Sequence, residues 1–406
     1  MKSGLLGRKL GHSYSPQIHA LMGEYPYDLF EKEPEDVADF VRNGDFTGIN
    51  VTIPYKKDVI PCMDELSPMA KRMGAVNTIV RRSDGTLFGH NTDYFGFSSM
   101  VRRSGISVEG KKVLVLGSGG ASNTAVKVLE DMGAQVIIIS RCGENNYDNL
   151  YLHADAAVIV NTTPVGMYPN TGVSAVDLKT FPKLEGVLDM IYNPARTQFL
   201  LDAEELGLPR ENGLWMLVAQ AKEAAEYFGG KALPDTIIES VYNTLSDQMQ
   251  NIVLIGMPGC GKSTVGKALA EKLGRTFVDA DAEIVKLAGK SIPEIFAQDG
   301  EEVFRRFETQ ALSELGKKSC LVIATGGGCV TRERNYPLLH QNSRIFWLRR
   351  ELDKLPTDGR PLSQANKLTD MYAVRKPMYE RFADHVIDNN GTLENTLGAI
   401  TAHLEG

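Results

Sequence analysis

Two glycine-rich loops, each preceded by a run of apolar residues, constrain the fold of this 406-residue chain more than any other feature. The first, KKVLVLGSGGAS, spans residues 111–122, and the second, NIVLIGMPGCGKST, spans residues 251–264. Each pattern predicts a buried parallel strand, a tight turn and the start of a helix. Further apolar runs at 136–140, 156–163 and 186–192 alternate with helical stretches, which indicates parallel α/β sheets.

Composition excludes several classes of protein. The chain is 43% hydrophobic and 23% charged, which is typical of a folded globular protein of two or three domains. A net charge of −7 disfavours nucleic acid as a partner. We expect no membrane association and a cytoplasmic location, because no apolar run reaches the length of a membrane span and the N-terminus lacks a signal peptide. The five cysteines form no CxxC pair and are expected to be reduced.

The predicted domains are 1–100, 101–213 and 250–406. In the first, NVTIP at 50–54 is the clearest strand, and the helical pattern at 215–228 predicts that residues 214–245 pack back onto it. The polar segment 243–250 contains no Gly or Pro. We therefore expect a helix end there that leads almost directly into a strand.

The first glycine loop has the features of a dinucleotide site. Glycines let the backbone approach a pyrophosphate, and a helix N-terminus favours its negative charge. An arginine after the next strand suits the 2′-phosphate of NADP, where a carboxylate would favour NAD. The alternatives are a strand-turn-helix without a ligand, since Ser122 departs from the fingerprint, and a solvated surface arginine. The residues expected at the cofactor are Gly117, Ser118, Gly119, Gly120, Ala121, Ser140 and Arg141.

A spaced set of polar motifs surrounds this loop. They are HSYSPQIH (12–19), NVTIPYKK (50–57), GAVNT (74–78), HNTDYFG (90–96), NTTPVGM (161–167), DMIYNPARTQFL (189–200) and NGLWMLVAQA (212–221). In this order the set resembles the shikimate dehydrogenase family from about residue 4 to about residue 245. The loop at 141–156 and the region 23–48 are shorter than the family's, and Cys142 departs from its cofactor motif.

The resemblance implies a role for each matching residue. Lys56 and Asp93 would form the catalytic pair, with Asp93 also contacting substrate, because an alkoxide made by hydride transfer needs a proton donor beside it. The alternative for the pair is a surface salt bridge. No chemistry is assigned to His12, His19 or His90. The remaining roles implied are the substrate carboxylate for Ser13 and Ser15, its hydroxyls for Thr52, Asn77, Tyr192 and Gln220, and the nicotinamide for Met190 and Gly213.

The second glycine loop fits the pattern GxxxxGK[ST]. Its backbone N–H groups would cradle the phosphates of ATP, Lys262 would reach the terminal phosphates and Ser263 would ligate Mg²⁺. The pattern predicts a nucleoside triphosphate site and leaves the second substrate open. The residues expected at the nucleotide are Gly259, Cys260, Gly261, Lys262, Ser263 and Thr264.

Further motifs follow at FVDADAEI (277–284), GEEVFRRFE (300–308), ATGGG (324–328), GRPLS (359–363) and VRKPMYERFA (374–383). Together they resemble shikimate kinase over residues 251–404. Taken singly, DADAE fits a solvated strand end and RRFE fits an exposed helix face with an i,i+3 ion pair. The roles implied by the resemblance are Mg²⁺ through water for Asp279, the attacking hydroxyl for Asp281, the substrate carboxylate for Arg305 and Arg375, close approach to the ring for Gly327, and the transferred phosphoryl group and nucleotide for Arg360.

The expected fold class is α/β: a substrate domain, a Rossmann NADP-binding domain and a P-loop domain similar to nucleoside monophosphate kinases. The expected function is bifunctional, with NADPH-dependent reduction of 3-dehydroshikimate and then ATP- and Mg²⁺-dependent phosphorylation of shikimate. These are consecutive steps toward chorismate and the aromatic amino acids. Small molecules are the expected partners, and a homodimer is left open. The alternatives are a non-catalytic regulator that senses a metabolite and a quinate dehydrogenase that uses NAD.

Overall fold

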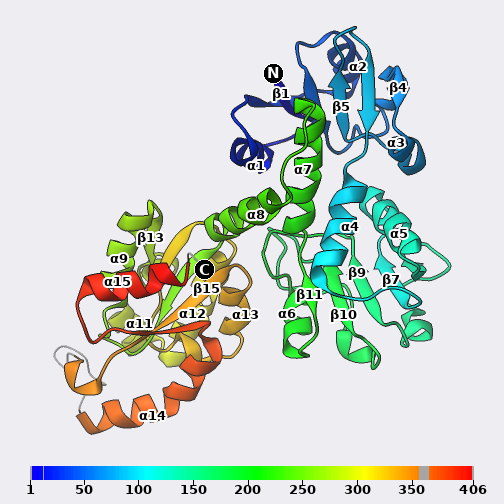
Figure 1. Ribbon diagram of the computed structural model, residues 1–406. Helices are drawn as coiled ribbons and strands as arrows, with labels where there is room; N and C mark the ends of the chain where they lie inside the picture. Colours follow the sequence, from blue (N-terminus) through cyan, green and yellow to red (C-terminus); the bar gives the residue numbers. More distant parts are fainter. Residues whose placement is uncertain (1, 12, 356–364, 405–406) are drawn as a thin grey trace. The chain divides into compact units, whose positions relative to one another are not determined.

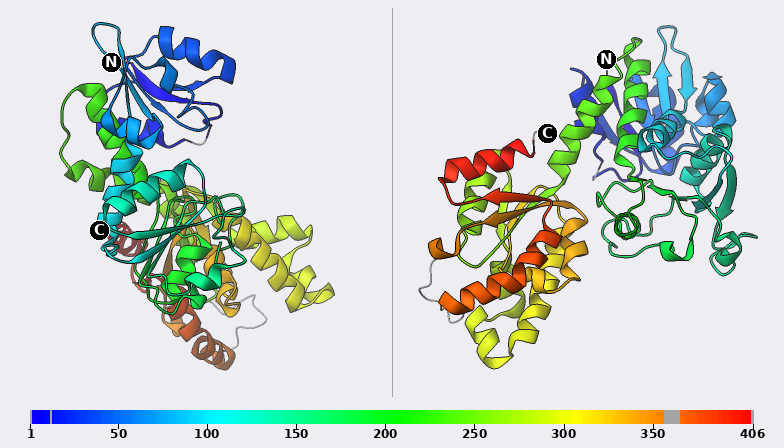
Figure 2. Two further views of the ribbon diagram at one scale, coloured as in Figure 1. Left: turned by 90° about the vertical axis from the view of Figure 1, so that its right-hand side faces the viewer. Right: turned by 60° about the horizontal axis from the view of Figure 1, so that its bottom comes forward.

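The computed structural model describes residues 2–11, 13–355 and 365–404 (Figures 1 and 2). It divides into two compact units. The first comprises residues 1–165, 174–192 and 202–245, and the second comprises residues 166–173, 193–201 and 246–406. The first unit holds two sheets and the second holds one.

The first sheet is mixed and has the strand order β2-β1-β3-β5-β6-β4. β1 is parallel to β2 and β3, whereas β5 is antiparallel to β3 and β6. Its strands are β1 (Ser3–Gly7), β2 (Tyr27–Glu31), β3 (Gly48–Val51), β4 (Glu65–Leu66), β5 (Thr78–Arg81) and β6 (Leu87–His90).

Helices α1 (Ser15–Met22), α2 (Pro34–Asn43), α3 (Pro68–Met73) and α7 (Leu214–Gly229) accompany this sheet. Helix α7 contacts α1, β3 and β5. The approach is close. A Cβ atom at Gly48 would come within 2.2 Å of the Phe228 ring, so only glycine fits beneath α7 at that point.

The second sheet is entirely parallel, with the order β11-β10-β9-β7-β8. The first glycine loop lies where expected, because β7 ends at Leu116 and α5 begins at Gly120. The buried side chains of β7 and β9 pack against α4 and α5. The elements are β7 (Lys112–Leu116), β8 (Gln135–Ile139), β9 (Val158–Asn161), β10 (Gly186–Asp189), β11 (Arg210–Glu211), α4 (Asp93–Ser104), α5 (Gly120–Asp131) and α6 (Gln198–Glu205).

The third sheet is also parallel, with the order β13-β14-β12-β15-β16 and the second glycine loop after its central strand. Its strands are β12 (Asn251–Ile255), β13 (Thr276–Asp279), β14 (Leu321–Ala324), β15 (Ser343–Arg349) and β16 (His385–Asp388). Its helices are α9 (Lys262–Leu273), α10 (Ala280–Ala288), α11 (Ile292–Gln298), α12 (Glu301–Gly316), α13 (Asn335–His340), α14 (Ala365–Phe382) and α15 (Leu393–Ala402). Short 3₁₀ turns lie at η1 (Ile60–Cys62), η2 (Leu150–His153), η3 (Leu178–Thr180), η4 (Cys329–Thr331) and η5 (Leu352–Lys354).

The junction before the third sheet agrees with its prediction, whereas the strand β3 is shorter than predicted. Helix α8 (Thr236–Met249) ends one residue before β12 begins, which confirms the expected passage from helix to strand. The predicted strand at 50–54 is wrong beyond Val51, because residues 53–59 form turns and the Tyr55 N–H donates to the Thr52 carbonyl at 3.0 Å. Pro54 has no N–H to donate to a sheet.

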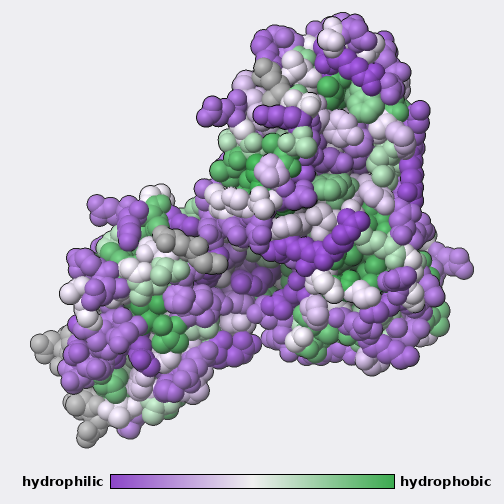
Figure 3. Space-filling view, viewed as in Figure 1, coloured by the Kyte–Doolittle hydropathy of each residue, from purple (hydrophilic) through white to green (hydrophobic). Residues whose placement is uncertain are grey.

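Hydrophilic residues predominate on the face of the molecule drawn in Figure 3. Within the part of the chain that the structure describes, no helix is both long and apolar enough to cross a membrane.

Candidate active sites

Lys56 and Asp93 form an ion pair in the first unit. Asp93 is the first residue of α4, where the helix N-terminus favours a carboxylate, and Lys56 lies in the turns after β3. The Lys56 amine donates to one carboxylate oxygen at 2.6 Å, and the Asn77 amide donates to the other at 3.0 Å. The side chains keep 29% and 14% of their exposure, so this pair lies in a recess rather than on the open surface. The alternative of an ordinary surface salt bridge is therefore disfavoured.

A cavity of about 520 Å³ opens beside this pair. Every residue predicted to contact substrate or nicotinamide in the first unit lines it. They come from the chain around the start of α1, the segment after β3, the residue before β5, the start of α4, the segment after β10, and helix α7 with the residue before it, which are far apart in sequence. These residues are Ser13, Ser15, Thr52, Lys56, Asn77, Asp93, Met190, Tyr192, Gly213 and Gln220.

Buried hydrogen bonds hold Asn77 in place, and they come from residues that have no predicted role. The Tyr27 hydroxyl donates to the Asn50 side-chain oxygen at 2.7 Å, and the Asn50 amide donates to the Thr78 hydroxyl at 3.2 Å. Thr78 in turn donates to the Asn77 side-chain oxygen at 3.1 Å, which turns the Asn77 amide toward Asp93. Asn50 and Thr78 belong to the motifs at 50–57 and 74–78, but their contact exists only in the folded chain.

His19 is a structural residue of the same unit. Its ring stacks on Tyr27 with centroids 4.0 Å apart, and its Nδ1 lies 2.6 Å from the Tyr25 hydroxyl. Burial lowers the pKa of His19 to about 3, against the smaller opposing effect of a hydrogen bond to Asn50. The imidazole is therefore neutral at physiological pH.

Tyr192 and Gly213 shape the far side of the cavity. Burial raises the pKa of the Tyr192 phenol, and its ring meets Tyr14 edge to face with centroids 6.1 Å apart. A Cβ atom at Gly213 would come within 2.1 Å of the Met190 carbonyl oxygen. Glycine is therefore required for α7 to begin this close to the strand β10.

The glycine loop after β7 lines a second cavity of about 880 Å³. Ser118, Gly119, Gly120 and Ala121 all face it, and Gly117 adopts a φ of +111° that favours glycine. This cavity and the first share Lys56, Asp93 and Ala121 among their lining residues. A ligand lying on the glycine loop can therefore reach the ion pair.

Ser140 and Arg141 lie outside both cavities but at the same edge of the sheet as the glycine loop. β7 and β8 are parallel neighbours, and the Gly117 N–H donates to the Ile139 carbonyl at 2.8 Å. Arg141 is exposed immediately after β8. The Ser140 N–H is occupied by the Asn145 carbonyl, which curls the short loop back onto the strand end.

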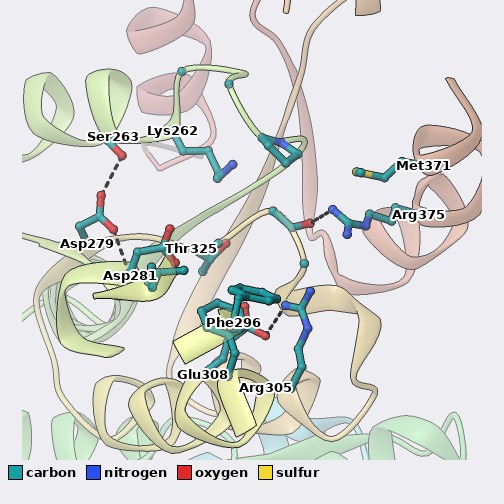
Figure 4. Close-up of a pocket in the computed structure, with 18 of the residues that line it drawn as sticks. Lys262, Ser263, Asp279, Asp281, Phe296, Arg305, Glu308, Thr325, Met371 and Arg375 are labelled. Carbon is teal, nitrogen blue, oxygen red and sulfur yellow. Dashed lines mark hydrogen bonds and ion pairs between the residues drawn. The ribbon is translucent and has the colours of Figure 1, made fainter. Parts of the chain in front are cut away.

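The second unit contains a cavity of about 540 Å³ over its glycine loop (Figure 4). The Lys262 amine lies inside the loop, where it donates to the carbonyls of Gly256 and Met257 at 2.8 and 3.0 Å. The Ser263 hydroxyl donates to Asp279 at 2.9 Å, and the other Asp279 oxygen accepts from the Asp281 N–H at 3.0 Å.

Of the predicted nucleotide residues, all but one that the structure describes line this cavity. The exception is Cys260, whose fully buried side chain belongs to the core, so only its backbone could contact a ligand. Arg360 lies outside the described residues. The predicted residues that line the cavity are Gly259, Gly261, Lys262, Ser263, Thr264, Asp279, Asp281, Arg305, Gly327 and Arg375.

Arg305 and Glu308 form a buried ion pair on α12. The Arg305 guanidinium donates to Glu308 at 2.8 Å, and the two side chains are 9% and 1% exposed. The i,i+3 pair of the RRFE segment thus exists, but the alternative of an exposed helix face is wrong. The second Glu308 oxygen has no hydrogen-bond partner among the described residues, and burial raises the pKa of this carboxyl against the charge of Arg305.

Gly327 contacts both helix α14 and the glycine loop at this cavity. Its carbonyl accepts from Arg375 at 3.1 Å and from the Tyr379 hydroxyl at 2.6 Å. A Cβ atom at Gly327 would come within 2.6 Å of Pro258 in the glycine loop. Gly327 and Arg375 are predicted site residues, whereas Glu308 and Tyr379 have no predicted role, although they belong to the motifs at 300–308 and 374–383.

Two family models match the parts of the chain that carry these cavities. The family model of the shikimate dehydrogenase substrate binding domain matches residues 5–79, and that of shikimate kinase matches residues 258–405. A shikimate dehydrogenase (NADP(+)) of Clostridium perfringens is 38% identical over 264 residues, which cover 60% of this chain and 97% of the relative.

Two solved structures match the same part of the chain. Shikimate dehydrogenase 1 from Peptoclostridium difficile is 38% identical, with a TM-score of 0.55 and coverage of 60% of this chain and 98% of that one. A chorismate mutase/shikimate 5-dehydrogenase fusion protein from Clostridium acetobutylicum is 36% identical, with a TM-score of 0.57 and coverage of 60% and 97%.

Proposed function

The chain belongs to the shikimate dehydrogenase family in its N-terminal part and carries a shikimate kinase domain after it, and from this premise we propose that it reduces 3-dehydroshikimate with NADPH and then phosphorylates the shikimate formed. It is thus a bifunctional enzyme with an oxidoreductase and a phosphotransferase activity. The two reactions are consecutive, because the hydroxyl made by the first is the one phosphorylated by the second.

One observation supports the reduction most strongly. The Lys56–Asp93 pair sits where the substrate-sized cavity and the glycine-loop cavity share lining residues. In the reduction of a ketone, the hydride donor must reach the carbonyl carbon while the proton donor lies beside the carbonyl oxygen. Residues that line both cavities can bring a substrate in one and a cofactor in the other to the same point.

In the proposed reduction, bound NADPH supplies the hydride to the carbonyl carbon. The Lys56 ammonium gives a proton to the carbonyl oxygen as negative charge develops there. Asp93 keeps Lys56 oriented, and the Asn77 amide holds the second oxygen of Asp93. Ser13 and Ser15 bind the substrate carboxylate, while Thr52, Asn77, Tyr192 and Gln220 bind its hydroxyls.

Met190 and Gly213 contact the nicotinamide in this proposal, and residues 117–121 bind the cofactor phosphates. Arg141, with Ser140, binds the 2′-phosphate at the end of β8, which supports NADPH over NADH. The quinate alternative with NAD would be better served by a carboxylate at that position. The regulator alternative is set aside, because both parts of the chain match enzymes.

In the proposed phosphorylation, Asp281 accepts the proton of the shikimate hydroxyl as its oxygen attacks the γ-phosphorus of ATP and ADP leaves. Arg305 and Arg375 bind the shikimate carboxylate, and Gly327 allows the ring to approach the backbone. Lys262 releases the loop carbonyls and contacts the terminal phosphates, supported by the backbone of residues 259–264. Arg360 stabilises the transferred phosphoryl group.

A magnesium ion fits the residues beside Lys262. Ser263 and Asp279 present a hydroxyl and a carboxylate oxygen 2.9 Å apart, and Mg²⁺ prefers such oxygen ligands and keeps several waters. Ser263 would hold the ion directly and Asp279 through water. When bound, Mg²⁺ neutralises charge on the phosphates.

Two assays on the purified chain test the proposal. NADPH absorbance should fall on addition of 3-dehydroshikimate, and ADP should appear when shikimate and ATP are supplied with Mg²⁺ but not with EDTA. Absence of either activity in a folded preparation would refute the corresponding half of the proposal.

A further inference from the structure

The larger cavity of the first unit concentrates positive charge. Although the whole chain carries a net charge of −7, this cavity is lined by five cations and a single carboxylate. The cations are Lys56, Lys57, Lys71, Arg72 and Lys127, and the carboxylate is Asp93. Such an imbalance around one cavity favours an anionic ligand.

Two of these cations bind other groups of the protein. Arg72, on α3, pairs with Asp131, and Lys127, on α5, donates to the Arg72 carbonyl. The Asn123 amide adds a hydrogen bond to the Met73 carbonyl at 3.1 Å. These contacts tie α3 to α5, so that residues of α3 have a defined place beside the glycine loop.

The amines of two other cations are available to a ligand. Lys56 is paired with Asp93, whereas the exposed amines of Lys57 and Lys71 have no hydrogen-bond or ion-pair partner among the residues that the structure describes. A Lys ammonium offers three donors, and phosphate oxygens satisfy them well.

The glycine loop lines the same cavity and offers complementary donors. Helix α5 begins at Gly120, so its first free N–H groups and its dipole favour an anion there. A Cβ atom built at Gly119 or Gly120 would meet nothing within 4 Å, so the space in front of the helix start is open.

We propose that Lys57 and Lys71 bind the diphosphate of the dinucleotide from the α3 side of this cavity, together with the glycine loop. This inference rests on the proposed dehydrogenase function and assigns the diphosphate and the 2′-phosphate of NADPH to different residues. The lysines bind the diphosphate that NADPH and NADH share, and Arg141, outside the cavity, binds the 2′-phosphate that only NADPH carries.

The test measures the dissociation constants of NADPH and NADH by fluorescence titration of the intact chain at two salt concentrations. The variants are K57A/K71A, R141A and the charge-matched control K179A/K231A, whose exposed lysines line none of these cavities. We expect K57A/K71A to weaken both cofactors by the same factor, about tenfold, with a shallower salt dependence. R141A should weaken NADPH alone, and the control should change neither.

Unchanged affinities in K57A/K71A, or a loss confined to NADPH, would overturn the inference, the latter because the lysines would then bind the 2′-phosphate. A wild-type chain that binds neither cofactor would instead refute the dehydrogenase proposal itself. If the alanine pair lowers the melting temperature, K57Q/K71Q keeps the side-chain stems and K57R/K71R should restore binding of both cofactors.

Discussion

At the scale of single residues, Lys56 is the proton donor that the proposed reduction depends on most. Replacing it with alanine should lower NADPH oxidation by 3-dehydroshikimate at least ~100-fold, the typical contribution of acid–base catalysis. ADP release with added shikimate should be unchanged, because the kinase cavity lies in the other unit.

The K179A variant serves as a matched control, since it removes an exposed lysine that lines no described cavity. If K56A keeps more than about a tenth of wild-type turnover, another group donates the proton.

His19 makes the stability of the first unit sensitive to acid. Its pKa is lowered from 6.5 to about 3 by burial, so the unfolded chain binds a proton that the folded chain rejects. The free energy of unfolding should therefore fall as the pH drops from about 6.5 toward 3, by up to about 1.4 kcal/mol per pH unit.

Hydrogen exchange of the β1 and β3 amides, corrected for intrinsic rates, would measure this loss between pH 7 and 4. H19Q cannot titrate and should show a smaller pH dependence even if it is less stable at neutral pH. An equal pH dependence in wild type and H19Q would assign the acid sensitivity to other groups.

At the scale of elements, the contact between Gly327 and the second glycine loop determines the shape of the kinase cavity. A methyl group at Gly327 would press on Pro258, whose backbone cannot move without disturbing the loop. We expect G327A to lower kinase turnover at least about tenfold, through a misplaced loop, and to leave NADPH oxidation intact.

Gly398 supplies the comparison, because it lies inside α15 and a Cβ atom there meets nothing within 4 Å. G398A should keep kinase activity and raise stability by up to about 1 kcal/mol, through the better helix propensity of alanine. Kinase activity in G327A equal to that of G398A would show that the loop tolerates the contact.

The elements also show what the sequence could predict. Both strand-loop-helix units were predictable, because a short local pattern determines them. The sequence does not separate the turns after Val51 from the preceding strand, since β-branched residues continue to Ile53 and only Pro54 marks the change.

The supporting residues of the sites depend on contacts between distant segments. Asn50 and Thr78 meet only when β3 and β5 pair, and the resemblance alone does not tell which motif residue contacts the catalytic group. Glu308 was seen as half of a helical ion pair, but its burial follows from tertiary packing.

At the scale of the whole molecule, we predict that the two activities are separable. The cavities of the first activity are lined by residues between 5 and 220, and that of the second by residues between 258 and 375. A fragment ending at Gln248 should fold and reduce 3-dehydroshikimate, and one starting at Met249 should fold and phosphorylate shikimate.

A longer kinase fragment that starts at Asn243 should be the more stable of the two. It keeps Asp247, which pairs with Arg344 and whose carbonyl accepts from Arg275. Solubility, melting temperature and turnover of the three fragments would be compared with those of the intact chain. An insoluble or inactive part would mean that the predicted boundary near Gln250 does not separate functional domains.

If one chain performs two consecutive reactions, the intact protein should carry 3-dehydroshikimate through both of them. The most direct measurement supplies only 3-dehydroshikimate, NADPH and MgATP, and follows NADPH loss, ADP release and the product mass. We expect shikimate 3-phosphate as the product, with one NADPH consumed for each ADP released at completion. K56A should abolish both NADPH loss and ADP release, and added shikimate should restore ADP release. K262A should abolish ADP release and leave NADPH loss unchanged. Two results with the wild-type chain would contradict this expectation. One is NADPH loss without ADP release, and the other is ADP release from 3-dehydroshikimate and MgATP when NADPH is left out.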